Sequence, residues 1–472
     1  MSTRTSRPNV TLAVLAVGGL AFSLLQSLVA PALATLQHDL HTSESDVTWV
    51  LTGYLLSAAI TTPIVGRLGD VHGKRRVLLI TLWILTAGTL LAALATSLWM
   101  MLVARVLQGI GGGIFPLAFA IIRDEFPRDR VSGSIGLMSA LLGLGGGLGV
   151  VLSGLIIENL SVHWLFWLPF VLIALTTVAA QALIPESPNT TRVPINWVGA
   201  GLMSVGLSAV LLAVNETTSW GWGSSKTLGL MAAGAVVLAL WVWSELRSES
   251  PLVDMRMMAL RGVWTTNIVG LAIGAGMWGA FVLIPQFAQT PPSEGFGFDS
   301  SVVAAGTFLL PLAVAMLIIG SVAGSLERRF GSKALVVAGA ISAMTGFVLI
   351  LADHDAKLPL YLATGCVGVG VGLAFAAVAN IIVETVPPSQ TGVATGMNTV
   401  ARNLGGAFGA QIAATFLATS AAGREFPTVH GYDQAFLVAL IALAISALAA
   451  TLIPGRARRA PARGPVTQPE TA

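Results

Sequence analysis

Charged residues are scarce in this chain. Of its 472 residues, 25 are lysine or arginine and 22 are aspartate or glutamate, so that only 10% carry a charge. Soluble domains carry about 25%, and 55% of this sequence is hydrophobic, which excludes an ordinary soluble protein. Cysteine is rarer still: the single Cys366 excludes an intramolecular disulfide and a multi-cysteine metal site.

Most of the sequence consists of long apolar runs. About 20 apolar residues in a helix span a bilayer, and only helices or closed barrels satisfy their backbone groups in lipid. Fourteen such runs predict an all-α polytopic membrane protein with 14 transmembrane helices. The runs begin near Val10, Val47, Val77, Trp99, Ser132, Trp164, Ile195, Thr227, Val263, Val302, Ala334, Pro359, Gly392 and Gln434.

The basic residues predict the orientation. With the N-terminus in the cytoplasm, 20 lysines and arginines fall in inside segments, and only Lys226, Lys357 and Arg424 fall in outside loops. The positive-inside rule then places both termini in the cytoplasm of a multi-pass cell-membrane protein. The pI of 9.3 is therefore explained by the basic residues of the cytoplasmic segments, and it does not indicate a nucleic-acid partner. The excess of arginine over lysine, 21 to 4, favours a bacterial source.

An internal repeat divides the chain. "GRLGDVHGKRRVLL" after the second run resembles "GSLERRFGSKALVV" after the tenth, at an offset of 258 residues, and the glycines of the fifth and thirteenth runs match at 260. Repeated halves around a midplane site are typical of secondary transporters. The predicted parts are a cytoplasmic tail (1–9), a six-helix bundle (10–184), a two-helix insertion (195–243), a second six-helix bundle (263–453) and a disordered cytoplasmic tail (454–472).

Two motifs carry a family resemblance. "GRLGDVHGKRR" resembles the helix 2 to 3 motif of the major facilitator superfamily, and "RVLQGIG" resembles its helix 4 motif at Arg105 and Gln108. With fourteen helices, the chain is similar to the multidrug efflux type of drug:proton antiporters. This resemblance implies a secondary active exporter of hydrophobic drug-like molecules that works by alternating access and is coupled to protons.

The first motif also has a physical interpretation. Its glycines allow close approach and a tight turn, while its aspartate and basic residues can bond to neighbouring helix ends when the cytoplasmic side is closed. We expect a conformational gate, completed by two glycines of the fifth helix on which that helix packs or bends. The alternative is that the basic residues are topology anchors only. The gate residues are Gly66, Asp70, Gly73, Lys74, Arg75, Gly145 and Gly149.

Arg105 and Arg402 are the only ionisable residues well inside predicted helices. An arginine at the bilayer centre costs about 2.5 to 3.5 kcal/mol on insertion scales, so each should face a partner, water or a cavity. One interpretation makes Arg105 a brace that bonds to backbone carbonyls. The other, supported by the resemblance, places it in the central cavity beside substrate or a proton-carrying group; for Arg402 both stay open.

The sequence departs from the antiporter pattern in helix 1 and in the fifth helix. Antiporters of this type usually have an aspartate in helix 1, where alignment on Pro31 puts Phe22. The fifth helix also lacks the proline of the antiporter motif, since Val150 stands at that position. Two peripheral acids, Asp46 and Glu158, are the candidates for proton coupling, with a plain solvated helix-end role as the alternative.

A substrate pathway follows from the polar and aromatic residues of the inner helices. Aromatic faces and few polar groups suit a hydrophobic organic substrate, with packing against neighbouring helices as the alternative role for each residue. The predicted pathway residues are Arg105, Gln108, Gln26, Arg402, Asn403, Trp278, Phe281, Gln286, Asn380 and Asn398.

Two further functions compete with drug export. The buried positive charges could clamp an anionic endogenous metabolite, with different coupling. A non-transporting membrane sensor would need a soluble domain, and no predicted loop is long enough for one. No phosphate-binding loop of the Gly-x4-Gly-Lys-Ser/Thr type occurs. The sequence thus predicts neither an enzyme nor a primary pump, with no metal and no cofactor; the expected partners are a small-molecule substrate, protons and the lipid bilayer.

Overall fold

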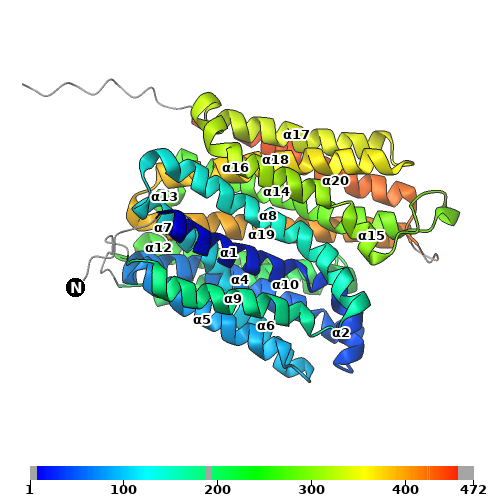
Figure 1. Cartoon of the computed structure of the whole chain (residues 1–472), viewed down its shortest axis with the longest axis horizontal. Coiled ribbons are helices and arrows are strands. Elements are labelled where there is room, and N and C mark those ends of the chain that lie inside the picture. Colours follow the sequence, from blue (N-terminus) through cyan, green and yellow to red (C-terminus); the bar gives the residue numbers. More distant parts are fainter. Residues whose placement is uncertain (1–7, 187–193, 422–423, 425, 455–472) are drawn as a thin grey trace, which may run out of the picture.

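The computed structural model describes residues 8–186, 194–421, 424 and 426–454. Within these ranges every regular element is a helix, and the long helices run side by side in one bundle (Figure 1). The predicted all-α membrane fold is confirmed. Most of the predicted tails, 1–7 and 455–472, lies outside the described residues.

The N-terminal half contains six spans, of which the fourth is divided by a short 3-10 turn. Its long helices are α1 (Pro8–Ser27), α4 (Trp49–His72), α5 (Lys74–Ala93), α6 (Leu98–Gly109), α7 (Ile114–Glu125), α8 (Arg128–Asn159) and α9 (Trp164–Leu183). Shorter pieces are η1 (Ala30–Ala32), α2 (Leu33–Asp39), α3 (Glu44–Val47) and η2 (Ile110–Gly113). The turn η2 falls on a run of three glycines, which are poor helix formers.

Two inserted helices and a second set of six spans follow. The insertion holds α10 (Trp197–Asn215) and α12 (Ser225–Arg247), and the C-terminal half holds α14 (Arg261–Gln289), α16 (Leu310–Phe330), α17 (Ser332–Ala352), α18 (Lys357–Thr385), α19 (Thr391–Ser420) and α20 (Val429–Thr451). Shorter pieces are α11 (Thr217–Trp220), α13 (Met255–Met258), η3 (Pro292–Glu294), α15 (Val302–Thr307) and η4 (Pro388–Gln390).

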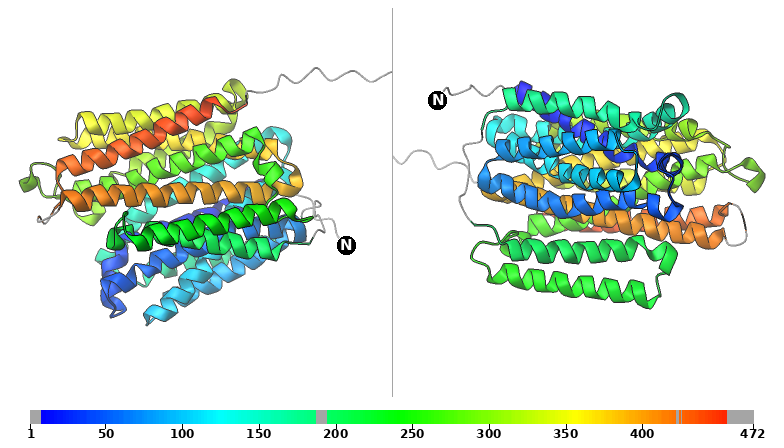
Figure 2. Two further views of the ribbon diagram at one scale, coloured as in Figure 1. Left: turned by 180° about the vertical axis from the view of Figure 1, so that it is seen from behind. Right: turned by 90° about the horizontal axis from the view of Figure 1, so that it is seen from below.

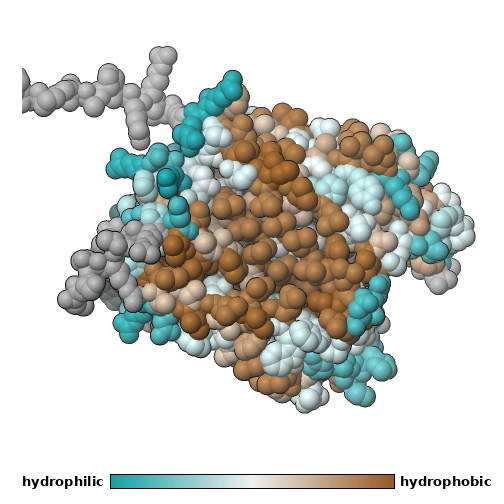
Figure 3. Space-filling model, viewed as in Figure 1, coloured by the Kyte–Doolittle hydropathy of each residue, from teal (hydrophilic) through white to brown (hydrophobic). Residues whose placement is uncertain are grey.

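Thirteen of the described spans are long and apolar enough to cross a membrane. The remaining long helix, α19, has 30 residues but is rich in polar side chains. Together they agree with the fourteen spans that the apolar runs predict. The side of the bundle seen in Figure 3 carries a broad apolar belt, as a lipid-facing surface requires.

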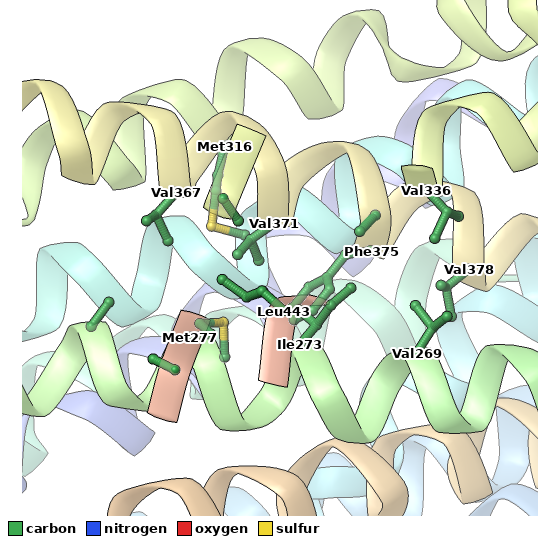
Figure 4. Packing of buried hydrophobic residues seen from close by; sticks show 14 of the residues in the cluster. Val269, Ile273, Met277, Met316, Val336, Val367, Val371, Phe375, Val378 and Leu443 are labelled. Carbon is green, nitrogen blue, oxygen red and sulfur yellow. The ribbon is translucent and has the colours of Figure 1, made fainter. Parts of the chain in front are cut away.

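The buried apolar side chains form two clusters, one centred in each half. The first reaches from Val14 to Ile184 and also takes in Ala379 and Val383 of α18, and the second reaches from Ala200 of the insertion to Ile453. In the second cluster Ile273 of α14 and Phe375 of α18 lie together (Figure 4). Each half therefore has its own core, and the space between the cores is where a site can form.

The repeat is visible in the backbone. Gly73 joins α4 to α5 with φ of 102°, and Gly331 joins α16 to α17 with φ of 84°. These glycines stand 258 residues apart, and both need the left-handed conformation that other residues adopt at a cost. Both turns lie at the end of the bundle where α1 begins and α20 ends, called here the termini end; the opposite end is the far end (Figure 1).

The inserted helices form an extra layer along one side of the bundle (Figure 2). Helix α10 lies against α4 of the first half and α19 of the second. Asn215 donates a hydrogen bond to the hydroxyl of Thr52 at 3.0 Å, and the indole N–H of Trp222 donates to Thr415 at 2.8 Å. The insertion is therefore attached to both halves.

Candidate functional site

A cavity of about 340 Å³ lies between the two halves. Its lining includes the η1 segment, the end of α14 and the start of α15, so it reaches toward the far end. No lining residue is acidic. The lining residues are Ser23, Gln26, Ser27, Ala30, Pro31, Leu142, Gly143, Gly146, Val150, Met277, Trp278, Phe281, Val282, Pro285, Gln286, Gln289, Val302, Arg402 and Asn403.

The N-terminal wall of the cavity is built by α1 and α8. The hydroxyl of Ser23 donates to the carbonyl of Leu142, and that of Ser27 donates to the carbonyl of Gly145 at 2.8 Å. A β-carbon on Gly145 or Gly149 would overlap Ser23 or Ser27, respectively. The predicted glycines of helix 5 thus hold α8 close to α1, and Gln26 of the same α1 segment lines the cavity.

The C-terminal wall is built by α14 and α19 in the same way. A β-carbon on Gly405 would overlap the carbonyl of Leu271, and one on Gly409 would lie 2.7 Å from Ala275. Trp278 packs over Gly406, and its ring centroid lies 6.2 Å from that of Phe281. The close approach of the two helices therefore leaves room for an aromatic pair at the cavity.

Arg402 lines this cavity from the middle of α19. Its guanidinium carbon lies 4.7 Å from the centre of the Phe375 ring, a cation–π contact. Among the described residues, none accepts a hydrogen bond from its side chain or forms an ion pair with it. Arg402 also lines a smaller space of about 20 Å³ between the halves, beside Asn398 and Phe115.

Arg105 has the opposite surroundings. It is 0% exposed and lies outside the lining of both cavities. Its Nε donates to the carbonyl of Val50 at 2.9 Å, its Nη1 donates to Gln108 at 2.7 Å, and its guanidinium carbon lies 4.2 Å from the centre of the Tyr54 ring. In this conformation Arg105 therefore has the geometry of a structural brace that bonds to a backbone carbonyl.

Phe22 occupies the neighbourhood where the family resemblance implies a carboxylate. It is 4% exposed, and its ring centroid lies 6.2 Å from that of Tyr54 and 6.3 Å from that of Phe115. Its aromatic neighbours make this an apolar core position. The two predicted coupling acids are exposed instead: the carboxylate of Asp46 accepts a hydrogen bond from the hydroxyl of Ser43, the N-cap of α3, and Glu158 lies near the end of α8.

The halves meet directly at the termini end. The carboxylate of Asp70, which is 1% exposed, accepts hydrogen bonds from the backbone N–H groups of Gly392 at 3.3 Å and Val393 at 3.2 Å. These groups belong to the first turn of α19, where an anion is favoured. A β-carbon on Gly66 would overlap the carbonyl of Gly392, so α4 and α19 touch through their backbones.

Basic residues complete this contact. Arg123 of α7 donates to the hydroxyl of Thr391 at 2.6 Å and to the carbonyl of Val386 at 2.8 Å, and so links the two halves. Lys74 forms a buried ion pair with Asp124 within the first half. Arg75 donates to the carbonyl of Gln181 at 2.9 Å. Only the first of these crosses between the halves, and the motif did not include it.

A second link at the termini end was not predicted. Glu327, at the end of α16 and 2% exposed, accepts hydrogen bonds from the hydroxyls of Ser132 and Ser332 and from Asn380 at 2.6 Å. Ser132 belongs to α8, so this carboxylate also joins the halves. The repeat offered the signal, because Glu327 lies one residue before the position that matches Asp70.

The predicted pathway residues therefore separate into three groups. Gln26, Trp278, Phe281, Gln286, Arg402 and Asn403 line the main cavity. Asn398 lines the smaller space and donates to the carbonyl of Thr266 at 2.9 Å. Arg105, Gln108 and Asn380 line neither.

Sequence reasoning missed Ser23, Ser27 and Gln289 as lining residues. Residues three or four apart share a face of a helix, and Ser23 stands three residues before Gln26 and four before Ser27. The helical period of α1 was therefore a signal that could have found the two serines.

The fold is a helical membrane fold built from two repeated halves with a cavity between them. The family model described as Major Facilitator Superfamily matches residues 15–410. The chain belongs to this superfamily, and its described helices are those of a multi-pass membrane protein.

Several curated proteins are similar over most of this chain. An uncharacterized MFS-type transporter of Mycobacterium tuberculosis is 30% identical over 85% of the chain, which spans only 58% of that protein's length. The multidrug transporter protein MdtP of Bacillus subtilis is 30% identical over 82% of the chain and 71% of its own length. The cephamycin export protein CmcT of Amycolatopsis lactamdurans is 30% identical over 97% of the chain and 96% of its own length.

A solved structure has the same fold. The human organic anion transporter MFSD10 matches 95% of this chain and 99% of its own with a TM-score of 0.63, at 16% identity. At that identity the likeness concerns the fold alone.

Proposed function

We propose that this protein is a secondary active exporter of hydrophobic drug-like small molecules, driven by proton antiport and working by alternating access. The observation that carries the proposal is the cavity between the halves: it holds an aromatic pair, reaches toward the far end, and is separated from the termini end by direct contacts between the halves. The multidrug and export names of the relatives support the direction of transport.

The termini end acts as the gate in this proposal. With both termini in the cytoplasm, as the lysine and arginine distribution predicts, the described conformation is closed to the cytoplasm and its cavity is directed outward. Opening toward the cytoplasm requires Asp70 to leave the first turn of α19 and Arg123 to leave Thr391. Glycine contacts between α1 and α8, and between α14 and α19, let each half move as a unit.

Dye accumulation in inverted membrane vesicles tests this function. We would follow ethidium, a cation, and fluorescein, which carries a carboxylate, while the pH gradient and the voltage are collapsed separately. Accumulation of either dye that stops with the pH gradient supports proton-coupled export. Absence of accumulation of both dyes, in vesicles whose protein is folded and correctly inserted, would contradict it.

Asp46 and Glu158 remain the proposed coupling residues. Asp46→Asn or Glu158→Gln should abolish accumulation driven by the pH gradient without changing protein abundance. If both single variants and the double variant transport normally, proton coupling through these acids is excluded.

A second candidate, export of an endogenous anionic metabolite, is favoured by one observation. The main cavity contains a cation, Arg402, and no acid. Accumulation of fluorescein but not of ethidium in the same vesicles would favour this candidate.

A further inference from the structure

The cavity carries one charge that no described residue pairs with. A guanidinium has five N–H donors and no acceptor, and Arg402 directs none of them to an acceptor among the described residues; its guanidinium lies over the face of the Phe375 ring. Helix α19 brings this side chain to the cavity eleven residues after its first residue, Thr391, within a 30-residue span. The site therefore has a fixed positive charge near the middle of the bundle.

Neighbouring residues supply no compensating charge. The lining of the main cavity and that of the smaller space beside Arg402 contain no aspartate or glutamate. The buried carboxylates Asp70 and Glu327 have their own hydrogen-bond donors at the termini end. Water can hydrate the guanidinium while the cavity is open, but closing the cavity removes this water, and an unpaired buried charge is unfavourable. The missing anion must then arrive with the ligand.

The other lining residues indicate the chemistry of the part of the ligand that lies outside its anionic group. Trp278 and Phe281 offer aromatic surface on the same side as Arg402. Carboxamides of Gln26, Gln286 and Asn403 can donate to or accept from further polar groups. A volume of about 340 Å³ lies in the range of small-molecule sites.

We propose that this cavity selects amphipathic organic monoanions, whose carboxylate pairs with Arg402 and whose apolar ring lies against Trp278 and Phe281. Arginine is suited to this task because its planar fork matches a carboxylate with two parallel hydrogen bonds. The inference rests on the proposed function only in making this ligand the transported molecule. Binding itself can be measured without transport.

A matched pair of ligands isolates the charge. We would titrate the purified full chain in lipid nanodiscs with 1-naphthylacetate and with its neutral amide, 1-naphthylacetamide, by calorimetry. The ring is the same in both, so the ratio of the two affinities reports the carboxylate. We expect the wild type to bind the carboxylate at least tenfold more tightly than the amide.

Variants assign that preference to Arg402. Arg402→Met should lower the affinity ratio to below threefold by weakening only the carboxylate, and Arg402→Lys should leave an intermediate ratio because it keeps charge but loses the fork. Trp278→Leu should weaken both ligands alike. Arg424→Met removes the same charge from an exposed site near the end of α19 and should leave the ratio unchanged. Should Arg402→Met fail to fold, the lysine variant and the wild-type ratio still decide.

The possible results are distinct. Equal affinity of the wild type for both ligands, including no measurable binding of either, would overturn the inference, as would a tenfold preference that survives in Arg402→Met. If added chloride removes the preference in the wild type, and the preference appears only in chloride-free buffer without a competing carboxylate, the site holds an inorganic anion and the inference also fails. A carboxylate preference without dye accumulation in vesicles would contradict the proposed transport and leave this binding site standing.

Discussion

The two halves share a scaffold but use their central arginines differently. Glycines of α8 and α19 lie against α1 and α14 at matching positions, Gly145 with Gly405 and Gly149 with Gly409. Within this shared arrangement Arg105 is fully buried with two hydrogen bonds, whereas Arg402 is half-buried at the cavity and has only a ring face.

This difference shows what decides the role of a charge inside a membrane helix. Arg105 has acceptors from within its own half, the Val50 carbonyl and Gln108, which pair its Nε and Nη1, while its Nη2 is buried without a partner among the described residues. The side chain of Arg402 has no acceptor in the described part of the chain, so the cost of burying its charge is left to water or to a ligand. The same residue type thus serves stability in one half and, in our proposal, recognition in the other.

The largest effect should come from exchanging the arginines for methionine. Arg105→Met removes two hydrogen bonds of a charged group and leaves buried acceptors unpaired, so we expect a loss of about 3 kcal/mol of stability. Arg402→Met should cost less than about 1 kcal/mol. Thermal unfolding in one detergent measures both, and equal losses would end the distinction between the two arginines.

The glycine contacts should differ in whether they can be rescued. Gly149→Ala and Gly405→Ala should each cost about 1 to 3 kcal/mol by overpacking. The first clash is with the Ser27 side chain, and the second is with the Leu271 backbone. Adding Ser27→Ala should therefore restore most of the stability of Gly149→Ala, while Leu271→Ala should not help Gly405→Ala; rescue of both would show that the helices simply separate.

A smaller effect is expected at the gate. Asp70→Asn keeps the shape but removes a charge from the first turn of α19, worth about 1 kcal/mol or roughly a fivefold shift in the population open to the termini end. Thr395, 3% exposed on α19, becomes a reporter when changed to Cys in a Cys366→Ser background. N-ethylmaleimide should label it about fivefold faster in Asp70→Asn; an unchanged rate would argue that the contact of Asp70 with the first turn of α19 does not hold the gate closed.

The smallest effect concerns the ring over Arg105. The hydroxyl of Tyr54 is buried without a hydrogen-bond partner among the described residues. Tyr54→Phe keeps the ring and should change stability by less than about 0.5 kcal/mol. Tyr54→Leu removes the cation–π contact and should cost more. If the phenylalanine variant is as damaged as the leucine variant, the hydroxyl has a partner that this conformation does not reveal.

Much of the fold could be predicted because it depends on local sequence patterns. Apolar runs gave the spans, and the spacing of Gly66 and Gly73 identified the family motif. The contacts could not be predicted in the same way. Whether an arginine is paired depends on residues distant in sequence: Val50 lies 55 residues from Arg105, and Thr391 lies 268 residues from Arg123. Helical periodicity predicts which face of a helix is buried, but it does not predict which residues of another helix pack against that face.

The insertion makes the two sides of the bundle unequal. Because Asn215 bonds to Thr52 in one half and Trp222 bonds to Thr415 in the other, the α10–α12 pair bridges the line along which α4 and α19 meet. The corresponding line between α8 and α16 is closed by direct packing, since a β-carbon on Gly320 would overlap Ala140 and one on Gly136 would lie 2.9 Å from the carbonyl of Gly320. The two halves are therefore held together by an added helix pair on one side and by glycine contacts on the other, and any rocking of the halves has to strain both.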